Sequence, residues 1–556
     1  MTADDLSLSD PASIRERVLA AAAEEAAMRP FDPEPDEGPP DTTEIFDGVT
    51  VDDVEKCFRY NQVGDGILAM KLMRGKFCFD NVDQRPYRFN CTHWFRDKNC
   101  DWRKALFGVA DLYAMREAHH RAIAREADPS DHDGKKAIKR AEAWAKRVNA
   151  CRDVTRIRKI WEVATSGAGS LGISGDQWNK HPTLLPALNT VVDLETGKAI
   201  KPDPTQYFNK AATAPFLGLQ TEAKFWVETI HKALGGQDDL IDYFEYMVGF
   251  AATGIQTKDF FCAYGPGGDN GKSVIFEWLM KILGEFAGSI KVEMLLEEKF
   301  MRSADGPSPA MLKLRGLRMA VTSEAEAKHR FAMGKIKSIC SGGDRMEARG
   351  INAADIVEFV PELTLILHSN DLPKAAGNDE AFYRRLKLIL FGSKFINPAL
   401  GPEDTGRHIY HARPRTEVDK ILTAESPGIL AYIVRCAMKA IKLGDMPPPP
   451  ESVVRETNRY RAGEDLVGSF LRECTVPDTD NKERMKAIYT AFKKWCMEEQ
   501  MMTEKAVWSI KALGQDLRKR PGLEVIDSNV VYYKGLRIKE EFRQSDKPGA
   551  DSQVPF

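Results

Sequence analysis

The clearest pattern in the chain is a short, continuously apolar run that leads into a glycine-rich loop and then into a helical stripe. The run Phe260–Tyr264 has the composition of a β-strand that is buried on both faces. From Lys272 to Leu283 apolar residues recur at helical spacing, and Gly284 ends the pattern. The sequence therefore predicts a strand, a loop and a helix in direct succession.

The loop between this strand and this helix has most features of a phosphate-binding loop. The standard spacing is Gly-x4-Gly-Lys-Ser/Thr, but Pro266 stands where the first glycine belongs and Gly265 is one residue too far away. Loop N–H groups and the N-terminus of the following helix attract phosphate. We expect the Lys272 ammonium to reach the terminal phosphates of ATP and the Ser273 hydroxyl to ligate Mg²⁺. The candidate binding residues are Gly265, Gly267, Gly268, Asn270, Gly271, Lys272 and Ser273.

A second apolar strand, within Leu317–Ala327, ends in the carboxylates of Glu324 and Glu326. One carboxylate would hold the metal ion and the other would polarise the attacking water. We assign the metal to Glu324 because it follows the strand directly. Two exposed acids at the start of a helix would give the same pattern.

Two more strand ends carry candidate catalytic side chains. Asn370 follows the apolar strand Leu363–Leu367, where its amide would orient water or contact the terminal phosphate, although Asn-Asp-Leu-Pro is also good turn chemistry. Arg384 and Arg385 precede another buried strand. Arginine stabilises charge on a transferring phosphoryl group, sometimes from a neighbouring subunit. Strand-end cations in salt bridges are the alternative.

Patterns upstream predict a smaller sheet and several helices. Leu184–Pro202 predicts a hairpin that turns over Asp193–Lys198, and Ala223–Phe250 predicts two helices separated by a pair of glycines. Lys135–Lys159 carries ten Lys and Arg against two acids, and it predicts a helix with most of its charge on one side. Such a face is either solvated surface or, in a protein that handles DNA, a track for the phosphate backbone.

Beyond the proline-rich segment Met446–Ser452, the pattern predicts two helices and a hairpin. The helices lie within Arg484–Gln500 and Thr503–Arg520, with Thr503 as N-cap of the second, and the hairpin turns at Asp527–Asn529. This order is typical of a winged helix, which binds either DNA or protein. The cations that would face DNA are Lys505, Lys511, Arg518, Lys519 and Arg520.

Composition limits the class of protein. The chain is 43% hydrophobic and 29% charged, as in soluble globular proteins, and its formal charge of −3 restricts nucleic-acid contacts to local patches. No apolar run has the length of a membrane span, no secretory signal is present, and the ten cysteines are scattered, so we expect a cytoplasmic protein. Cys78, Cys91, His93 and Cys100 lie close enough in sequence to hold zinc, but their spacing matches no common zinc motif, and packed free thiols are the alternative.

Five segments between Phe260 and Phe391 resemble superfamily 3 helicases of the phage and plasmid primase–helicase family, which is related to the poxvirus primase-helicase. They are "GPGGDNGKS", "VTSEAEA", "CSGGDRMEARG", "LILHSNDLP" and "GNDEAFYRRLKLILF", in this order. The resemblance extends from about Asn61 to Lys539, and includes the Leu184–Pro202 hairpin of the domain that precedes these helicases. It implies an AAA+-like P-loop core within an α/β fold.

The resemblance also implies how the protein would act. It implies a hexameric ring, an ATPase that translocates on single-stranded or forked DNA with 3′-to-5′ polarity, and an arginine that acts in trans. Lys335, Lys337, Arg345 and Arg349 would grip the DNA backbone from a hairpin in the ring channel, with solvated cations as the alternative. The expected setting is replication of a phage, satellite or plasmid in the bacterial cytoplasm. No primase catalytic domain fits into the first fifty residues, so we expect a separate primase or polymerase.

Together these patterns divide the chain into six parts. They are an acidic, proline-rich tail, an N-terminal α+β domain, a helical collar, the ATPase core, a helical lid and a winged-helix-like C-terminal domain. The expected boundaries are 1–48, 49–216, 217–258, 259–400, 401–450 and 451–556.

The phosphate loop departs from the family by one residue, because Asp269 is additional. Its carboxylate would repel phosphate unless it turns outward or faces the metal, so we expect the loop to bulge at this position. Two alternative functions remain open. One is an ATP-switched origin-binding or loader protein without processive unwinding, and the other is a degenerate ATPase.

Overall fold

The computed structural model of the protein describes residues 44–46, 48–297, 308–324, 329–349, 356–375, 379–500, 504, 507–527 and 530–543. The described residues form two compact units. The first runs up to Pro86 and resumes over Asp97–Ile173, and the second comprises Tyr87–Arg96 and the residues described from Ser174 onward. The expected boundary at residue 216 does not coincide with this division, because residues 174–216 pack with the second unit.

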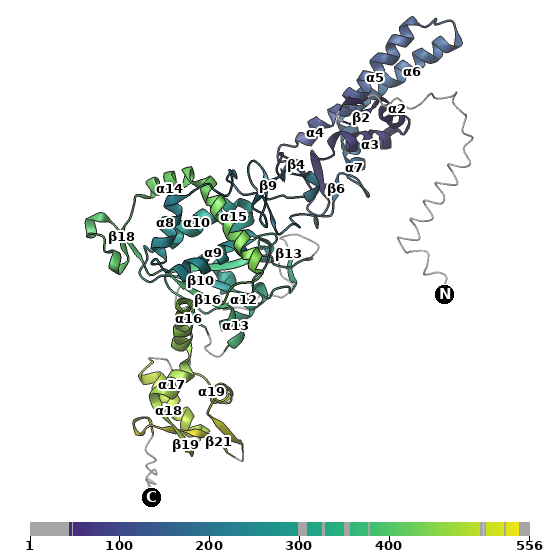
Figure 1. Ribbon diagram of the computed structural model, residues 1–556. Helices are drawn as coiled ribbons and strands as arrows, with labels where there is room; N and C mark the ends of the chain where they lie inside the picture. The colour runs from purple at the N-terminus through teal and green to yellow at the C-terminus, as the bar shows by residue number, and fades with distance from the viewer. Residues whose placement is uncertain are drawn as a thin grey trace, which may run out of the picture. The chain divides into compact units, whose positions relative to one another are not determined.

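The first unit is mainly helical (Figure 1). The sequence predicted one helix over Lys135–Lys159, but the structure has two. The chain leaves the first helix at Arg152, and the Asp153 carboxylate caps the second by accepting hydrogen bonds from the N–H groups of Thr155 and Arg156. The elements of this unit are β1 (Glu44–Phe46), β2 (Val49–Thr50), α2 (Val51–Arg59), α3 (Asn61–Met73), β3 (Phe77–Asp80), α4 (Asp101–Ala105), α5 (Phe107–Glu126), α6 (His132–Cys151), α7 (Val154–Ala164) and β6 (Gly172–Ile173).

A fully buried carboxylate, Asp65 of α3, joins the helices of this unit. It accepts hydrogen bonds from the Tyr113 hydroxyl at 2.9 Å and from Arg147 at 2.8 Å, and its second oxygen lies 2.5 Å from Arg156. Two of the ten cations in the basic segment therefore point inward and neutralise a buried charge. The predicted one-sided basic face is smaller than the sequence suggested.

Replacing Asp65 with alanine is expected to destabilise the first unit by about 3–5 kcal/mol, because both arginines lose the partner of a buried ion pair. Hydrogen exchange followed by mass spectrometry should show faster exchange in α3 and α7. The matched control is Asp83→Ala, since Asp83 is exposed, and it should leave the exchange of both helices unchanged. Equal exchange in Asp65→Ala and the wild type would contradict this role of Asp65.

The second unit is built on a five-stranded, wholly parallel sheet in the order β11-β12-β15-β10-β16. Alternate residues of β10 enter two hydrophobic cores, with Phe261 and Ala263 in one and Phe260 and Cys262 in the other. Helices α9, α10 and α15 contribute to the first core, and α12 and α13 contribute to the second (Figure 1). This two-sided burial explains the continuous apolar runs, and it confirms an α/β fold with a parallel sheet. The strands are β10 (Phe260–Tyr264), β11 (Ala287–Ser289), β12 (Met319–Ser323), β15 (Thr364–Ser369) and β16 (Leu386–Leu390).

The second unit also contains helices and small strands outside this sheet, and its β4 and β5 belong to a four-stranded sheet in the order β5-β4-β3-β6. The predicted Leu184–Pro202 hairpin is confirmed, and a third strand joins it to give the order β7-β8-β9. The two helices predicted around the glycine pair are α8 and α9. The remaining elements up to α15 are β4 (Arg85–Phe89), β5 (Trp94–Arg96), β7 (Leu184–Pro186), β8 (Val191–Asp193), β9 (Lys198–Ile200), α8 (Lys224–Ala233), α9 (Asp238–Ala252), α10 (Lys272–Leu283), α11 (Pro309–Leu312), α12 (Met333–Ile339), β13 (Met346–Arg349), β14 (Ile356–Phe359), α13 (Glu380–Arg385), β17 (Lys394–Ile396), β18 (Ile409–His411), α14 (Arg415–Ala424) and α15 (Ser426–Leu443).

A buried arginine at the start of β12 attaches the small sheet to the large one. The Arg318 guanidinium donates hydrogen bonds to the carbonyl groups of Ala252 at 2.9 Å, His181 at 3.0 Å and Leu184 at 2.8 Å, and it lies 4.2 Å from the Phe286 ring centroid. Burial lowers the pKa of Arg318 to about 9, so the side chain still carries its charge at pH 7. One cation therefore satisfies three carbonyl groups from two different segments.

Replacing Arg318 with methionine is expected to lower the free energy of unfolding of the second unit by about 3 kcal/mol. The substitution fills similar volume but leaves three carbonyl groups without their donor, and each unsatisfied group is costly. Thermal unfolding measured with limited proteolysis should show the loss. Lys313→Met is the control, because Lys313 is exposed. A melting temperature equal to that of the wild type would contradict this attachment.

The C-terminal residues differ from the predicted order in two ways. The second helix begins at Ile510 with Ser509 as its N-cap, and the expected cap Thr503 lies outside the described residues. A long strand, β19, was also missed, and it pairs with β21 in the order β19-β21-β20. The predicted hairpin of β20 and β21 is confirmed. The elements are α16 (Glu451–Glu464), α17 (Leu466–Cys474), β19 (Thr475–Arg484), α18 (Met485–Glu498), α19 (Ile510–Leu517), β20 (Glu524–Asp527) and β21 (Val531–Ile538).

Internal ion pairs change the set of C-terminal cations that would face DNA. Arg518 pairs with both oxygens of Asp527 at 2.9 and 2.8 Å. Arg520 is bound between Asp465 and Asp516, so it does not face DNA. Lys505 lies outside the described residues. Lys511 and Lys519 are exposed.

The described residues hold no arrangement of three or more His, Cys, Asp or Glu side chains suited to a metal ion. All ten cysteines are free thiols, and Cys78 is buried. In the part of the chain that is described, no single helix has the length and apolar composition of a membrane span. The bent pair α14–α15 meets those criteria only when its helices are taken together.

Candidate nucleotide site

The glycine-rich loop starts where β10 leaves the sheet and ends at the first turn of α10, as predicted. In the register of the sheet, Tyr264 pairs with Ser369 of β15, so Gly265 and Asn370 follow neighbouring strand ends. Gly271 precedes α10 in the left-handed region, with φ of +82°, which favours glycine. A Cβ at Gly265 would lie 2.8 Å from the Lys272 ammonium. Glycine at this position therefore leaves room for the lysine side chain.

The Lys272 ammonium is enclosed by three oxygen atoms at the edge of the sheet. It donates hydrogen bonds to the Gly265 carbonyl at 3.0 Å, the Asn270 side chain at 2.8 Å and the Asn370 side chain at 3.1 Å. The side chain is only 5% exposed, and this burial lowers the pKa of Lys272 to about 8, although Asp269 opposes the shift. A buried cation surrounded only by neutral oxygens is electrostatically suited to bind an anion.

The additional residue of the loop turns outward. Asp269 is exposed and has a φ of +53°, and its backbone carbonyl accepts a hydrogen bond from the N–H of Phe395 at 2.8 Å. The next residue, Asn270, donates from its amide to the Ser393 carbonyl at 2.8 Å. These two bonds attach the loop to the segment after β16. The bulge expected at Asp269 therefore leaves Asn270 and Lys272 directed toward the sheet.

The acidic strand ends at the same edge of the sheet. Ser323 of β12 pairs with His368 of β15, so Glu324 follows the third neighbouring strand end, and its φ is +61°. A left-handed backbone at a residue other than glycine is uncommon and is concentrated at functional sites. Glu324 and Ser273 are both exposed. Glu326 lies outside the described residues, so its predicted role stays a prediction.

The two arginines lie at the opposite edge of the sheet. Leu386, which follows Arg385, pairs with Phe260 at the start of β10, whereas the loop leaves the end of β10. Five strand residues separate the two edges by about 16 Å. An arginine of this helix therefore cannot reach a nucleotide bound at the Lys272 of its own chain.

The structure distinguishes Arg384 from Arg385. The Arg385 guanidinium is turned into the protein, where it donates to the carbonyl groups of Ala381 at 2.9 Å and Cys340 at 3.3 Å. Arg384 is exposed, and within the described ranges no hydrogen bond or ion pair involves its guanidinium. Arg384 is therefore the one of the pair that is available to another molecule.

The predicted DNA-contacting cations lie on α12 and on the hairpin of β13 and β14, which the structure confirms as an antiparallel pair. Lys337 forms an ion pair with Asp379 at 2.7 Å, and Arg345 pairs with Glu358 across the hairpin at 3.0 Å. Both pairs leave one cation partly neutralised. Lys335 and Arg349 are half-buried.

Sequence reasoning missed a pocket beside the loop. Its volume is about 220 Å³, and it lies between α8, the start of α10, β17 and the residues that follow β18. We call it the loop pocket. Its lining includes the rings of Phe225 and Phe395, the Val274 side chain, and the cations Lys232 and Arg413. These residues are far apart in the chain, so no local pattern could have brought them together.

One family model matches part of the chain. Residues 70–235 match the family model described as D5 N terminal like. The D5 N terminal like region ends in the segment just after α8, and the loop and the strand ends of the candidate site follow it in the chain.

Viral proteins named as helicases are distant relatives. "Putative helicase 022R" of Frog virus 3 is 28% identical over 233 residues, which cover 41% of this chain and 23% of the relative. "Putative helicase L207/L206" of Acanthamoeba polyphaga mimivirus is 24% identical, covering 55% and 32%. "Putative helicase 121R" of Invertebrate iridescent virus 3 is 24% identical, covering 77% and 49%. The chain thus spans between about a quarter and a half of the length of these relatives. Among solved structures, the apo NrS-1 C terminal region aligns with a TM-score of 0.34 and 11% identity, over 58% of this chain and 79% of that one.

Proposed function

We propose that the protein is an ATP-dependent DNA helicase of superfamily 3 with an AAA+-like core, an N-terminal α+β domain and a C-terminal winged helix. The single observation that carries the proposal is the Lys272 ammonium, which is buried among the Gly265, Asn270 and Asn370 oxygens at a parallel sheet edge. The viral relatives named as helicases support the same activity.

In this proposal the triphosphate of ATP lies along the loop Gly265–Ser273. Lys272 would exchange its neutral oxygen partners for phosphate oxygens, and Asn370, which contacts Lys272, would contact the terminal phosphate. Ser273 and Glu324 supply the oxygen ligands that Mg²⁺ prefers, and bound Mg²⁺ would neutralise charge on the phosphates. The loop pocket has apolar walls, among them Phe225, Phe395 and Val274, that would suit the nucleotide base.

Hydrolysis requires a neighbouring protomer in this proposal. Arg384 is exposed and too far from the Lys272 of its own chain, so it would stabilise the phosphoryl group bound by the next subunit. This geometry favours a ring, for which we propose a hexamer that moves 3′ to 5′. The four cations of this region, Lys335, Lys337, Arg345 and Arg349, would contact the DNA backbone in this proposal.

We propose that this motor acts in the cytoplasm during replication of a phage, satellite or plasmid, on single-stranded or forked DNA. Another chain would supply primer synthesis.

The test is a comparison of ATP turnover and strand displacement on a forked DNA, with Mg²⁺. The helicase proposal expects turnover that single-stranded DNA stimulates, and displacement that Lys272→Ala abolishes. Turnover that is slow and independent of DNA, with no displacement, would instead indicate an ATP-switched loader. Absence of both turnover and nucleotide binding would indicate a degenerate ATPase.

A further inference from the structure

Helix α16 packs against the edge of the large sheet, where no further strand of the described residues is paired. The edge strand is β16, and the Thr457 hydroxyl of α16 accepts a hydrogen bond from the backbone N–H of Leu388 at 3.1 Å. This contact pairs an edge-strand N–H that β10, on the other side of β16, does not bind. Although α16 follows the proline-rich boundary, it packs on the sheet and not only on the C-terminal helices.

The same helix holds two residues that follow Asn370, Pro373 and Ala375. The Tyr460 hydroxyl donates to the Pro373 carbonyl, and the Glu464 carboxylate accepts a hydrogen bond from the N–H of Ala375 at 2.9 Å. Burial raises the pKa of Glu464 and the pKa of Tyr460, so both polar groups are bound in a largely dry contact. The loop that leads away from Asn370 is therefore attached to α16 at two points.

Arg461 extends this contact to the helix that carries Arg384. Its guanidinium lies 2.6 Å from the Glu380 carboxylate and 5.1 Å from the Tyr383 ring centroid. Glu380 is in the first turn and Arg384 in the last turn of the six-residue helix α13. The Glu380–Arg461 pair is partly exposed and weak by itself, but it acts together with Tyr460 and Glu464, which hold the preceding loop.

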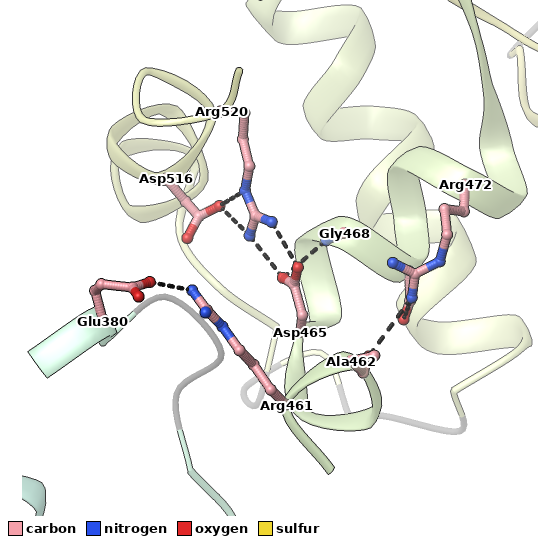
Figure 2. Close-up of polar contacts among 9 residues, drawn as sticks. Glu380, Arg461, Ala462, Asp465, Gly468, Arg472, Asp516 and Arg520 are labelled. Carbon is pink, nitrogen blue, oxygen red and sulfur yellow. Dashed lines mark hydrogen bonds and ion pairs between the residues drawn. The ribbon is translucent and has the colours of Figure 1, made fainter. Parts of the chain in front are cut away.

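The residue after Glu464 belongs to the C-terminal helices. Asp465 caps α17 by accepting from the N–H of Gly468 at 2.9 Å, and its two oxygens bind the Arg520 guanidinium at 2.5 and 2.6 Å. Arg520 also donates to Asp516 at 2.7 Å. Figure 2 shows Arg520 between the two carboxylates, and Arg461 directed from the same junction toward Glu380. Adjacent residues thus bind the loop from Asn370 on one side and the C-terminal helices on the other.

We propose that α16 positions Arg384 for ATP hydrolysis at the neighbouring protomer, and that the C-terminal helices set this position through the Asp465–Arg520 pair. Tyr460, Arg461 and Glu464 are positioning residues in this scheme, which rests on the proposed function. Tyr460 and Glu464 hold residues just after Asn370, which touches Lys272, and Arg461 contacts α13, which carries Arg384. A ligand of the C-terminal helices would therefore change ATP turnover without touching the nucleotide.

The test uses the full-length protein with Mg²⁺ and single-stranded DNA. Glu464→Ala and Arg461→Ala should each lower kcat about tenfold, because small displacements of a catalytic group are costly. KM for ATP should stay within about twofold, because the Lys272 site is intact. Glu464→Gln keeps an oxygen acceptor for the Ala375 N–H and should regain most of kcat. Arg520→Lys should lower kcat in the same way. The control is Arg459→Ala on the same helix, whose side chain is 82% exposed.

Mixing subunits separates positioning from a general loss of structure. Arg461→Ala subunits keep Lys272, and Lys272→Ala subunits keep a correctly held Arg384, so mixed oligomers should exceed the summed turnover of the two variants. The proposed positioning role is contradicted if mixing the subunits gives no gain in turnover. It is also contradicted if kcat of Arg461→Ala and Glu464→Ala equals that of the wild type, or if KM for ATP rises in step with the fall in kcat. Lack of ATP turnover in the wild type would instead contradict the proposed function.

Discussion

Lys272→Ala is expected to lower kcat for ATP hydrolysis by about 10²- to 10³-fold, the cost of removing one preorganised charge from a phosphoryl-transfer site. In the structure this ammonium is bound to three neutral oxygens, from Gly265, Asn270 and Asn370, and not to a carboxylate. No internal ion pair is lost when phosphate takes their place. The measurement is turnover at saturating ATP and Mg²⁺, together with equilibrium nucleotide binding.

The substitution should leave the protein folded, because alanine removes the desolvation penalty of a cation that is 5% exposed while three oxygens lose their donor, and the two effects oppose each other. The thermal unfolding temperature of Lys272→Ala should therefore stay close to that of the wild type. Lys420→Ala, an exposed lysine of α14, is the matched control and should keep full turnover. Wild-type turnover and nucleotide affinity in Lys272→Ala would show that the loop does not bind phosphate.

Arg384→Ala is expected to lower kcat by about 10³-fold or more, the range found for arginines that act in trans on a phosphoryl group. Affinity for ATP should change little, because Arg384 lies at the opposite edge of the sheet from Lys272 of the same chain. The measurement is kcat and nucleotide affinity across protein concentration, since a trans residue acts only in the oligomer.

Arg385→Ala is the internal comparison for Arg384→Ala. Its guanidinium binds the Ala381 and Cys340 carbonyl groups, so its loss should lower the free energy of unfolding by about 2–3 kcal/mol. Turnover of the folded variant should remain. If Arg385→Ala abolishes turnover at full stability while Arg384→Ala does not, the assignment of the two arginines is reversed.

Much of the candidate site follows from local sequence patterns. The strand Phe260–Tyr264, the loop and the helix Lys272–Leu283 were predicted at the bounds that the structure shows. The Asn370 strand end and the position of the arginines before β16 were also predicted correctly. These features depend on apolar periodicity and on glycine, and both act over a few neighbouring residues.

Predictions from the sequence were wrong where the structure depends on which acidic residue a cation pairs with or on where a helix is capped. A basic run of ten cations predicted one helix, but Asp153 starts a second helix and Asp65 turns two arginines inward. Arg520 resembled a DNA-facing cation, but Asp465 and Asp516 neutralise it from other elements. The sequence gives the number and position of charged residues, but only the fold determines which of them form ion pairs.

The sequence by itself determined the parallel α/β core, the phosphate-type loop, and which polar residues stand at strand ends, because hydrophobic period and turn chemistry are local properties. Only the tertiary structure decided that Lys272 meets Asn370, that Arg384 faces outward and Arg385 inward, and that α16 contacts both the residues after Asn370 and the helix that carries Arg384. Those outcomes depend on contacts between residues far apart in the chain, whose energies are set by burial and by the pairing of charges.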